Sequence, residues 1–207
     1  GPRVEEKPEP KGFDLMFGNP PWLRVRWEDS PLLSEFEPLL GVRDARSATY
    51  NRERPKLLKH DNFKMKYRSA FEQGQGGNVF LGSGVTYPFL SGVKANLYKN
   101  FIECSWGLLG EEGISGLLHP EGVFDDPKGG EFRGEYFKRL RAHYQVRNEL
   151  ILFADVGHQM TFSLNIYSGG VGEVGFYSIS NIFNPDTIRR CRNEELRDRV
   201  IPGIKDS

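Results

Sequence analysis

Short apolar runs and amphipathic stretches alternate along the chain and predict an α/β fold. Residues 13–18 form an apolar run that ends in a glycine and two prolines, which indicates a buried strand followed by a sharp loop. The same patterning predicts helices at 30–41, 96–109 and 131–144, and strands at 114–118, 146–153, 161–168 and 174–178. Because helices and strands alternate before the last two strands, we expect a mostly parallel sheet with an antiparallel hairpin edge that turns at Gly169 and Gly170.

Residues 42–68 differ from the rest of the chain in charge. They hold nine basic and three acidic residues, a net charge of +6, so the zero total charge conceals −6 elsewhere. Apolar residues recur there at mixed helical spacings, which predicts a helix with a basic outer face. Such a face either attracts nucleic-acid phosphates or is simply solvated. The candidate residues for contacts to a DNA backbone are Arg43, Arg46, Arg52, Arg54, Lys56, Lys59, Lys64 and Lys66.

Residues 74–84 are rich in glycine and predict a flexible loop. Their spacing does not match a phosphate-binding loop, because no GxxxxGK[ST] pattern occurs and the strand-to-helix context of a GxGxxG turn is missing. The two cysteines and four scattered histidines predict neither a disulfide framework nor a metal site, and they favour a reduced, cytoplasmic setting. No apolar run is long enough to predict a membrane helix.

The strongest candidate for chemistry is the sequence Asn19, Pro20, Pro21, Trp22, which directly follows the first predicted strand. Ligands of open α/β sheets bind beyond the carboxyl ends of the strands. Two successive prolines stiffen the loop and remove two N–H donors, so the loop presents carbonyl groups. The Asn19 amide oxygen and the Pro20 carbonyl could both accept from one exocyclic amino group, while Trp22 stacks on a base. The alternative is a proline-rich turn whose tryptophan belongs to the core.

The segment FDLMFGNPPW resembles motif IV, (N/D)PP(Y/F/W), of the S-adenosylmethionine-dependent amino-methyltransferases. Residues 86–124 resemble the helix, strand and proline-containing loop that follow this motif in adenine-N6 DNA methylases. Residues 150–169 resemble the region that carries motif VIII, and residues 179–188 and 202–206 resemble the segment beyond it. The resemblance is strongest to the large methylases of type IIG restriction-modification systems and of phage-defence islands such as BREX.

This resemblance implies methyl transfer from S-adenosyl-L-methionine to the N6 atom of an adenine flipped out of double-stranded DNA. Asn19 and Pro20 would accept from the adenine amino group, Trp22 would stack on the base, and Asn19 and Pro21 would also contact the cofactor. No aromatic residue stands in the usual register of motif VIII. His158 is therefore the candidate for the second stacking residue, with Phe153 and Phe162 behind it, and an ordinary loop histidine is the alternative.

The cofactor motif of the family, a glycine-rich loop after the first strand, should precede motif IV by many tens of residues. Only twelve residues precede the strand that carries motif IV here. We therefore expect the C-terminal half of a Rossmann-like methyltransferase fold, whose first strand has an exposed edge. The expected partners are double-stranded DNA, the missing N-terminal half of the domain and a target-recognition domain, with no membrane.

The expected domain organisation has three parts. Residues 1–11 form a linker or tail, residues 12–182 a partial catalytic domain with a basic insertion and glycine-rich loop at 42–84, and residues 183–207 the start of a connection toward the target-recognition region. The full-length parent would be a site-specific adenine DNA methyltransferase in the bacterial cytoplasm, associated with the nucleoid. The isolated chain would be inactive.

Two other hypotheses remain from the sequence. RNA methyltransferases and protein-glutamine methyltransferases also use NPPY-like loops, so the same chemistry could act on another amino or amide group. The chain could also be a non-catalytic DNA-binding or scaffold fragment that retains the fold.

Overall fold

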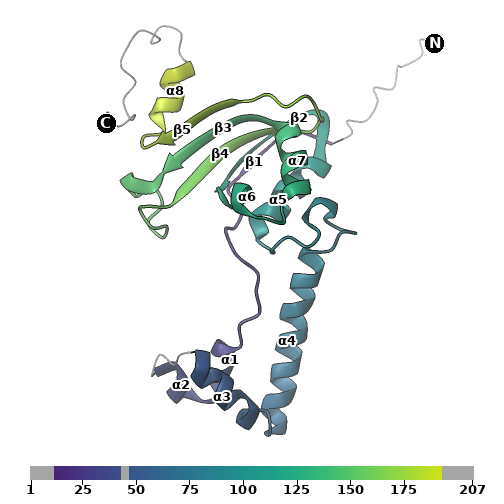
Figure 1. The fold of residues 1–207 in the computed structure, drawn as a ribbon, viewed down its shortest axis with the longest axis vertical. Coiled ribbons are helices and arrows are strands. Elements are labelled where there is room, and N and C mark those ends of the chain that lie inside the picture. Colours follow the sequence, from purple (N-terminus) through teal and green to yellow (C-terminus); the bar gives the residue numbers. More distant parts are fainter. Residues whose placement is uncertain (1–11, 43–46, 193–207) are drawn as a thin grey trace, which may run out of the picture.

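A five-stranded sheet with helices packed on it forms one part of the molecule, and a helical arm, residues 30–42 and 47–81, stands away from it (Figure 1). The computed structural model describes residues 12–42 and 47–192. The predicted tail at 1–11, the residues Arg43 and Arg46, and the segment 193–207 lie outside the described residues. The strands run in the spatial order β1 (Phe13–Gly18), β2 (Leu109–Pro120), β4 (Thr161–Ser168), β3 (Leu140–Arg147) and β5 (Tyr177–Ile182).

The sheet is mostly parallel, as the sequence predicts. β1 pairs with β2 and β3 pairs with β5 in parallel, whereas β4 pairs antiparallel with both β2 and β3. The antiparallel strand is thus an inner strand, and the prediction of an antiparallel hairpin edge is wrong. Gly169 and Gly170 do not turn the chain back on β4. Their N–H groups donate to the carbonyls of Gly113 and Glu111 in β2, at 2.9 Å each.

The boundary between α7 (Gly130–Arg139) and β3 also differs from the prediction. The sequence predicts a helix at 131–144, but the observed helix ends at Arg139. The sequence predicts a strand at 146–153, but the observed strand spans Leu140–Arg147. Ala142, Tyr144 and Val146 are buried in one apolar cluster on the sheet. Burial at every second residue is the strand period, so packing on the sheet outweighs the helical pattern at 140–144.

The predicted helix 30–41 is divided into α1 (Ser30–Phe36) and α2 (Pro38–Val42). Glu37 separates them with φ −126° and ψ 86°. The proline that follows Glu37 disfavours helical geometry at that position, which explains the break. The basic stretch forms two helices rather than one, α3 (Ser47–Leu57) and α4 (Asp61–Leu81).

The prediction of a flexible glycine-rich loop at 74–84 is wrong, because α4 continues to Leu81. The helix packs against Trp27, whose ring contacts Tyr67 and Phe71 edge-on, with centroid distances of 5.8 and 5.5 Å. A Cβ atom at Gly74 would lie 2.7 Å from the Trp27 ring. Glycine at this position therefore permits a close approach of tryptophan to the helix rather than a bend in the chain.

Three apolar clusters hold the molecule together. α5 (Leu97–Leu108), α6 (Gly122–Asp125), α7 and η1 (Pro88–Leu90) contribute to the cluster on one sheet face, which includes Tyr98, Tyr136 and Tyr167. A second cluster includes Phe162 from β4 and Ile182 from β5, with Ile188 of α8 (Asp186–Arg192) packed on it. The third cluster lies in the arm. η2 (Asn148–Leu150) follows β3.

β1 lies at one end of the described sheet and is highly exposed for an apolar strand. Phe13, Leu15 and Phe17 are 57%, 65% and 84% exposed. They alternate along the strand and so share one face, on which Leu15 is the register neighbour of Ile114 in β2. The prediction of a buried strand at 13–18 is therefore wrong, because β1 is an end strand of the described sheet and only Met16 within it is even partly buried. The exposed edge itself agrees with the expectation that the first strand of this chain has an open side. None of the helices in the described residues is long and apolar enough to cross a membrane.

Candidate functional site

The candidate site begins where β1 ends. β1 and β2 are parallel neighbours, with Gly18 in register with Leu117, so their carboxyl ends lie side by side. Asn19 follows β1 and is exposed, Pro20 is buried, and Pro21 is exposed. The loop is thus anchored through Pro20 while Asn19 remains open to a ligand. This placement at the carboxyl edge is the one expected for a binding loop of an open α/β sheet.

Trp22 fixes the other end of this loop to the sheet. Its indole N–H donates to the Leu118 carbonyl of β2 at 3.2 Å. Its ring lies 5.4 Å from Phe153 and 5.8 Å from Phe162, and these two phenyl rings are perpendicular to each other at 5.0 Å. The structure therefore brings together three of the predicted base-binding residues. Trp22 is half-buried and contacts both sheet clusters, so it also has the core role considered as the alternative.

Phe153 is held by a buried asparagine that sequence reasoning missed. Asn148 donates to the carbonyls of Phe153 and Val156 at 2.9 and 2.6 Å and accepts from the Phe153 N–H at 3.0 Å. Ile151, in the same segment, adopts a left-handed conformation with φ 50°. An asparagine after a strand and before a turn is a weak signal for such a loop-organising role.

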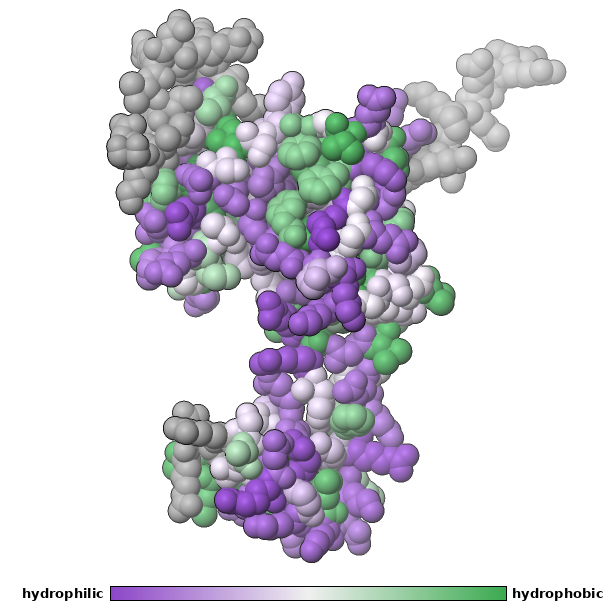
Figure 2. Space-filling model, in the orientation of Figure 1, coloured by the Kyte–Doolittle hydropathy of each residue, from purple (hydrophilic) through white to green (hydrophobic). Residues whose placement is uncertain are grey.

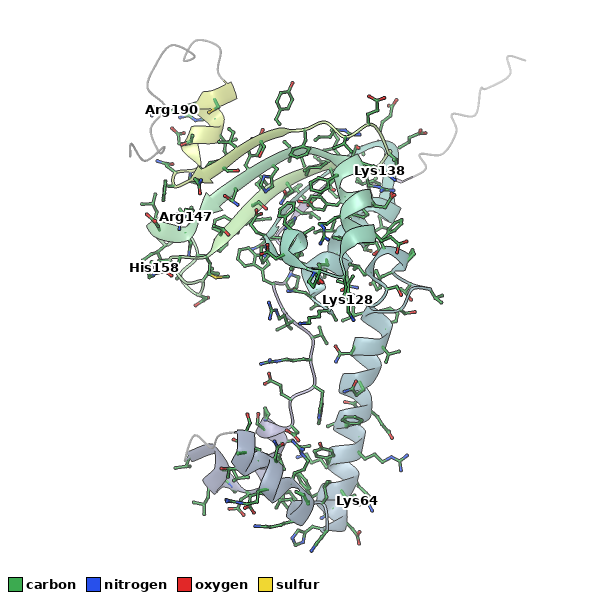
Figure 3. All side chains as sticks on the ribbon, viewed as in Figure 1. Lys64, Lys128, Lys138, Arg147, His158 and Arg190 are labelled. Carbon is green, nitrogen blue, oxygen red and sulfur yellow. The ribbon has the colours of Figure 1, made fainter. Side chains whose placement is uncertain are left out.

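His158 does not join the aromatic group. It is exposed and lies at the outer end of the segment between β3 and β4 (Figure 3), and no ring contact links it to Trp22 in the described part of the chain. Phe153 and Phe162 contact Trp22 directly instead of lying behind His158. The role of His158 as a second stacking residue remains a prediction.

A buried histidine lies at the carboxyl end of β2. Nδ1 of His119 is 2.8 Å from the Pro120 carbonyl, and Nε2 is 2.6 Å from the Tyr167 hydroxyl and 2.9 Å from the Asn165 amide. Burial lowers the pKa of His119 to about 4. The imidazole is therefore neutral at pH 7, donates from Nδ1 and accepts at Nε2. His119, Tyr167 and Asn165 are fully buried, so this group does not face solvent.

Glu121 follows β2 and connects three elements. His143 Nε2 lies 3.3 Å from both Glu121 carboxylate oxygens, and His143 Nδ1 lies 3.2 Å from the Ser178 hydroxyl of β5. Gln145 donates to the same carboxylate at 3.0 Å. Burial alone would raise the pKa of Glu121, but hydrogen bonds from His143, Ser163 and Gln145 outweigh it and lower this pKa. The network ties the start of α6 to β3 and β5.

A buried ion pair joins α5 to the loop after α6. Lys99 Nζ is 2.7 Å from the Asp126 carboxylate, and both side chains are 10% exposed or less. Burial raises the pKa of Asp126, but the hydrogen bonds from Lys99 and from the Lys128 N–H, together with the charges of Lys99 and Lys94, outweigh burial and lower this pKa. Because loss of one partner would leave a buried charge, the pair fixes this loop beside the candidate site.

The predicted DNA-backbone residues are partly neutralised by acidic neighbours. Arg52 and Lys56 both pair with Glu53, Arg54 pairs with Asp29, and Lys66 pairs with Glu35. Lys59 and Lys64 are exposed and form no ion pair with another described residue. The basic segment is therefore a weaker attractant for phosphate than its sequence charge indicates.

A cavity of about 450 Å³ lies in the arm, and its lining includes none of the residues 19–22 of the NPPW loop. Arg54 lines it and is held by Asp29, which also accepts from the Tyr67 hydroxyl at 3.2 Å. The cavity is lined by Arg26, Trp27, Glu28, Asp29, Ser30, Ser47, Tyr50, Asn51 and Arg54.

The described residues do not fit S-adenosylmethionine by themselves. The glycine-rich stretch that could have formed a cofactor loop is helical in α4, up to Leu81. No further strand lies beside β1 on its open side in the ranges 12–42 and 47–192. What these residues do offer is the exposed Asn19 side chain, which can accept a hydrogen bond, near the half-buried Trp22 ring.

Comparison of the sequence with models of protein families and with curated proteins found no match.

Proposed function

We propose that this chain is the part of an adenine-N6 DNA methyltransferase that carries the catalytic loop. The parent enzyme would transfer a methyl group from S-adenosylmethionine to a flipped adenine, in restriction-modification or phage defence. The observation that carries this proposal is the NPPW loop at the carboxyl end of β1, fixed by Pro20 and by the hydrogen bond from Trp22 to Leu118. The aromatic contacts of Trp22 with Phe153 and Phe162 support a base-binding pocket there.

The residues of the loop act by position and by hydrogen bonding. The Asn19 amide oxygen and the Pro20 carbonyl accept the two N–H bonds of the adenine amino group, which directs the nitrogen lone pair away from the loop. These acceptors stabilise the positive charge that grows on nitrogen as it is alkylated. A stiff loop loses little entropy when the base binds, so most of the rate acceleration comes from orientation. No covalent enzyme intermediate is needed.

The proposal includes a companion polypeptide segment that binds the cofactor. The exposed apolar edge at β1 supports this, because a strand with Phe13, Leu15 and Phe17 in solvent is a poor terminus for a sheet. A target-recognition domain completes the proposed enzyme.

The decisive experiment measures methyl transfer from labelled S-adenosylmethionine by a polypeptide that unites this chain with its cofactor-binding half. Duplex DNA, RNA and a release-factor protein serve as alternative acceptors. We expect label on N6 of adenine in duplex DNA. Label on RNA or on protein glutamine alone would refute the DNA assignment.

Asn19→Ala tests the loop within that polypeptide. We expect methyl transfer to be abolished, because one of the two acceptors of the amino group is removed, while DNA binding changes little. Tyr177→Ala, an exposed position on β5, serves as the matched control and should retain activity. Unchanged methyl transfer in Asn19→Ala would remove the basis of the proposal.

A non-catalytic DNA-binding or scaffold role is the second candidate. It is favoured by the poor fit of the described residues to the cofactor. Calorimetric titration of S-adenosylmethionine discriminates the two: the isolated chain should not bind, and the united polypeptide should bind. If the united polypeptide fails to bind, the scaffold role is preferred.

A further inference from the structure

The segment that follows the NPPW loop is fixed at its start by Trp22 and then by backbone hydrogen bonds to residues 95–97. Leu23 accepts from the Leu97 N–H at 3.0 Å and Val25 donates to the Ala95 carbonyl at 3.3 Å, so Arg24 and Asn96 form an antiparallel bridge. Trp22 is fixed to the sheet on one side. We name residues 23–26 and 94–97 the neck, since they connect the sheet to the arm (Figure 1).

Cationic side chains gather around the neck. Arg24 and Lys94 are exposed and come from its two paired segments. Lys128 lies beside it in the loop after α6 (Figure 3), and its backbone N–H donates to Asp126 at 3.1 Å. None of these three side chains forms an ion pair with another residue that the structure describes.

The backbone places these three cations in one region. Arg24 is bridged to Asn96, two residues from Lys94, and the Lys128 N–H donates to the Asp126 carboxylate at 3.1 Å. Burial raises the pKa of Asp126, and the charge of Lys94 is one of the influences that lower it. Asp126 itself is already neutralised by the buried Lys99. The surface between the sheet and the arm is accordingly strongly hydrophilic (Figure 2).

Most of the predicted DNA-contact cations in the arm are paired, unlike the three cations at and beside the neck. Four of its six described candidate cations are paired with acids, and only Lys59 and Lys64 are not. The neck cations begin two residues after Trp22. A nucleotide whose base reaches Asn19 must keep its flanking phosphates nearby, since backbone charges follow one another closely along a strand.

We propose that Arg24, Lys94 and Lys128 bind the backbone phosphates that flank the target nucleotide of double-stranded DNA. The inference rests on the proposed function and specifies which surface the DNA strand with the target nucleotide follows. The arm then lies beyond the neck along the duplex, with a supporting rather than primary role in phosphate binding.

The test measures binding of the chain to a 20-base-pair duplex by fluorescence anisotropy at several salt concentrations. The triple variant R24Q/K94Q/K128Q should reduce the slope of log Kd against log salt by about 2.7, since each lost phosphate contact removes about 0.9. A control with the same change of charge is K138Q/R189Q/R190Q. Figure 3 shows Lys138 and Arg190 far from the neck, and Arg189 precedes Arg190 in α8, so this variant should change the slope by less than about 1.

The charge-conserving variant R24K/K94R/K128R should retain the wild-type slope, and far-UV circular dichroism should show that all variants fold alike. An unchanged slope in the glutamine triple variant, or an equal loss in the control, overturns the inference.

The two proposals fail in different ways. If Asn19→Ala abolishes methyl transfer while the triple variant keeps its salt slope, only the neck inference is wrong. If the triple variant loses its slope while no methyl transfer occurs in the united polypeptide, the neck binds DNA and the proposed enzyme function is wrong.

Discussion

His119 couples the stability of the sheet to pH. Burial lowers its folded-state pKa to about 4, whereas its ordinary value is 6.5. The unfolded chain therefore takes up a proton in this interval that the folded chain does not. The stabilising contribution is complete above pH 6.5 and is lost as the pH falls toward 4.

We expect the free energy of unfolding to fall by about 3 kcal/mol between pH 6.5 and pH 4 because of this residue. Urea denaturation followed by circular dichroism at several pH values measures it. His119→Asn removes the titrating group, so its stability should depend less on pH in this window. If the free energy of unfolding depends on pH equally in the wild type and in His119→Asn, His119 is not the cause of the pH dependence.

At the scale of elements, α4 shows how one glycine differs from another. A Cβ atom added at Gly74 would lie 2.7 Å from the nearest atom of the Trp27 ring, whereas a Cβ atom at Gly76 would have no neighbouring atom within 4 Å. Alanine usually stabilises a helix by about 1 kcal/mol relative to glycine.

We therefore expect Gly76→Ala to stabilise the chain by up to about 1 kcal/mol and Gly74→Ala to destabilise it, since Trp27 must move. Thermal denaturation of the two variants compares the same substitution in the same helix. Equal stabilisation by both would show that the Trp27 contact does not limit this position.

β1 should make the isolated chain self-associate. Its exposed apolar face and unpaired backbone edge are a template for pairing with another strand. Leu15→Lys should raise the monomer fraction in sedimentation velocity. Val85→Lys, at a position that is 95% exposed outside the sheet, is the control and should leave the distribution unchanged. An equal effect of both variants would exclude β1 as the contact.

At the scale of the whole molecule, the arm has a core separate from those of the sheet. Leu33, Leu40 and Phe63 are buried there, and Phe63 contacts Phe36 and Tyr67 with ring distances of 4.8 and 5.8 Å. Because none of the residues of this cluster belongs to the sheet clusters, the arm can open while the sheet remains folded.

Phe63→Ala should destabilise the arm by about 3–5 kcal/mol, the usual cost of removing a buried phenyl ring. Hydrogen exchange should then show lost protection in α1, α3 and the first half of α4, with β2–β4 unchanged. Phe132→Ala, in the main sheet cluster, should instead reduce hydrogen-exchange protection in the sheet and leave protection in the arm unchanged. Uniform loss of protection in Phe63→Ala would mean that arm and sheet unfold together.

The sequence alone determined the elements whose signal is local. The run 13–18, the amphipathic stretch 96–109 and the strand 161–168 need only apolar spacing and flanking breakers, and the structure contains β1, α5 and β4 there. The position of Asn19 through Trp22 after a strand is equally local. The mostly parallel character of the sheet can also be predicted from the sequence, because it follows from alternating helices and strands.

Only the tertiary structure decided the rest, because it depends on partners distant in sequence. Trp27 packs against Gly74 in a glycine-rich stretch that is helical, and pairing with both β2 and β3 places the antiparallel strand β4 inside the sheet. Asp29 and Glu35, which lie outside residues 42–68, neutralise cations that the charge count of this segment leaves free, and the bridge between Arg24 and Asn96 brings other cations to the loop. Spacing along a chain encodes one element at a time, whereas charge balance and contact are properties of the folded surface.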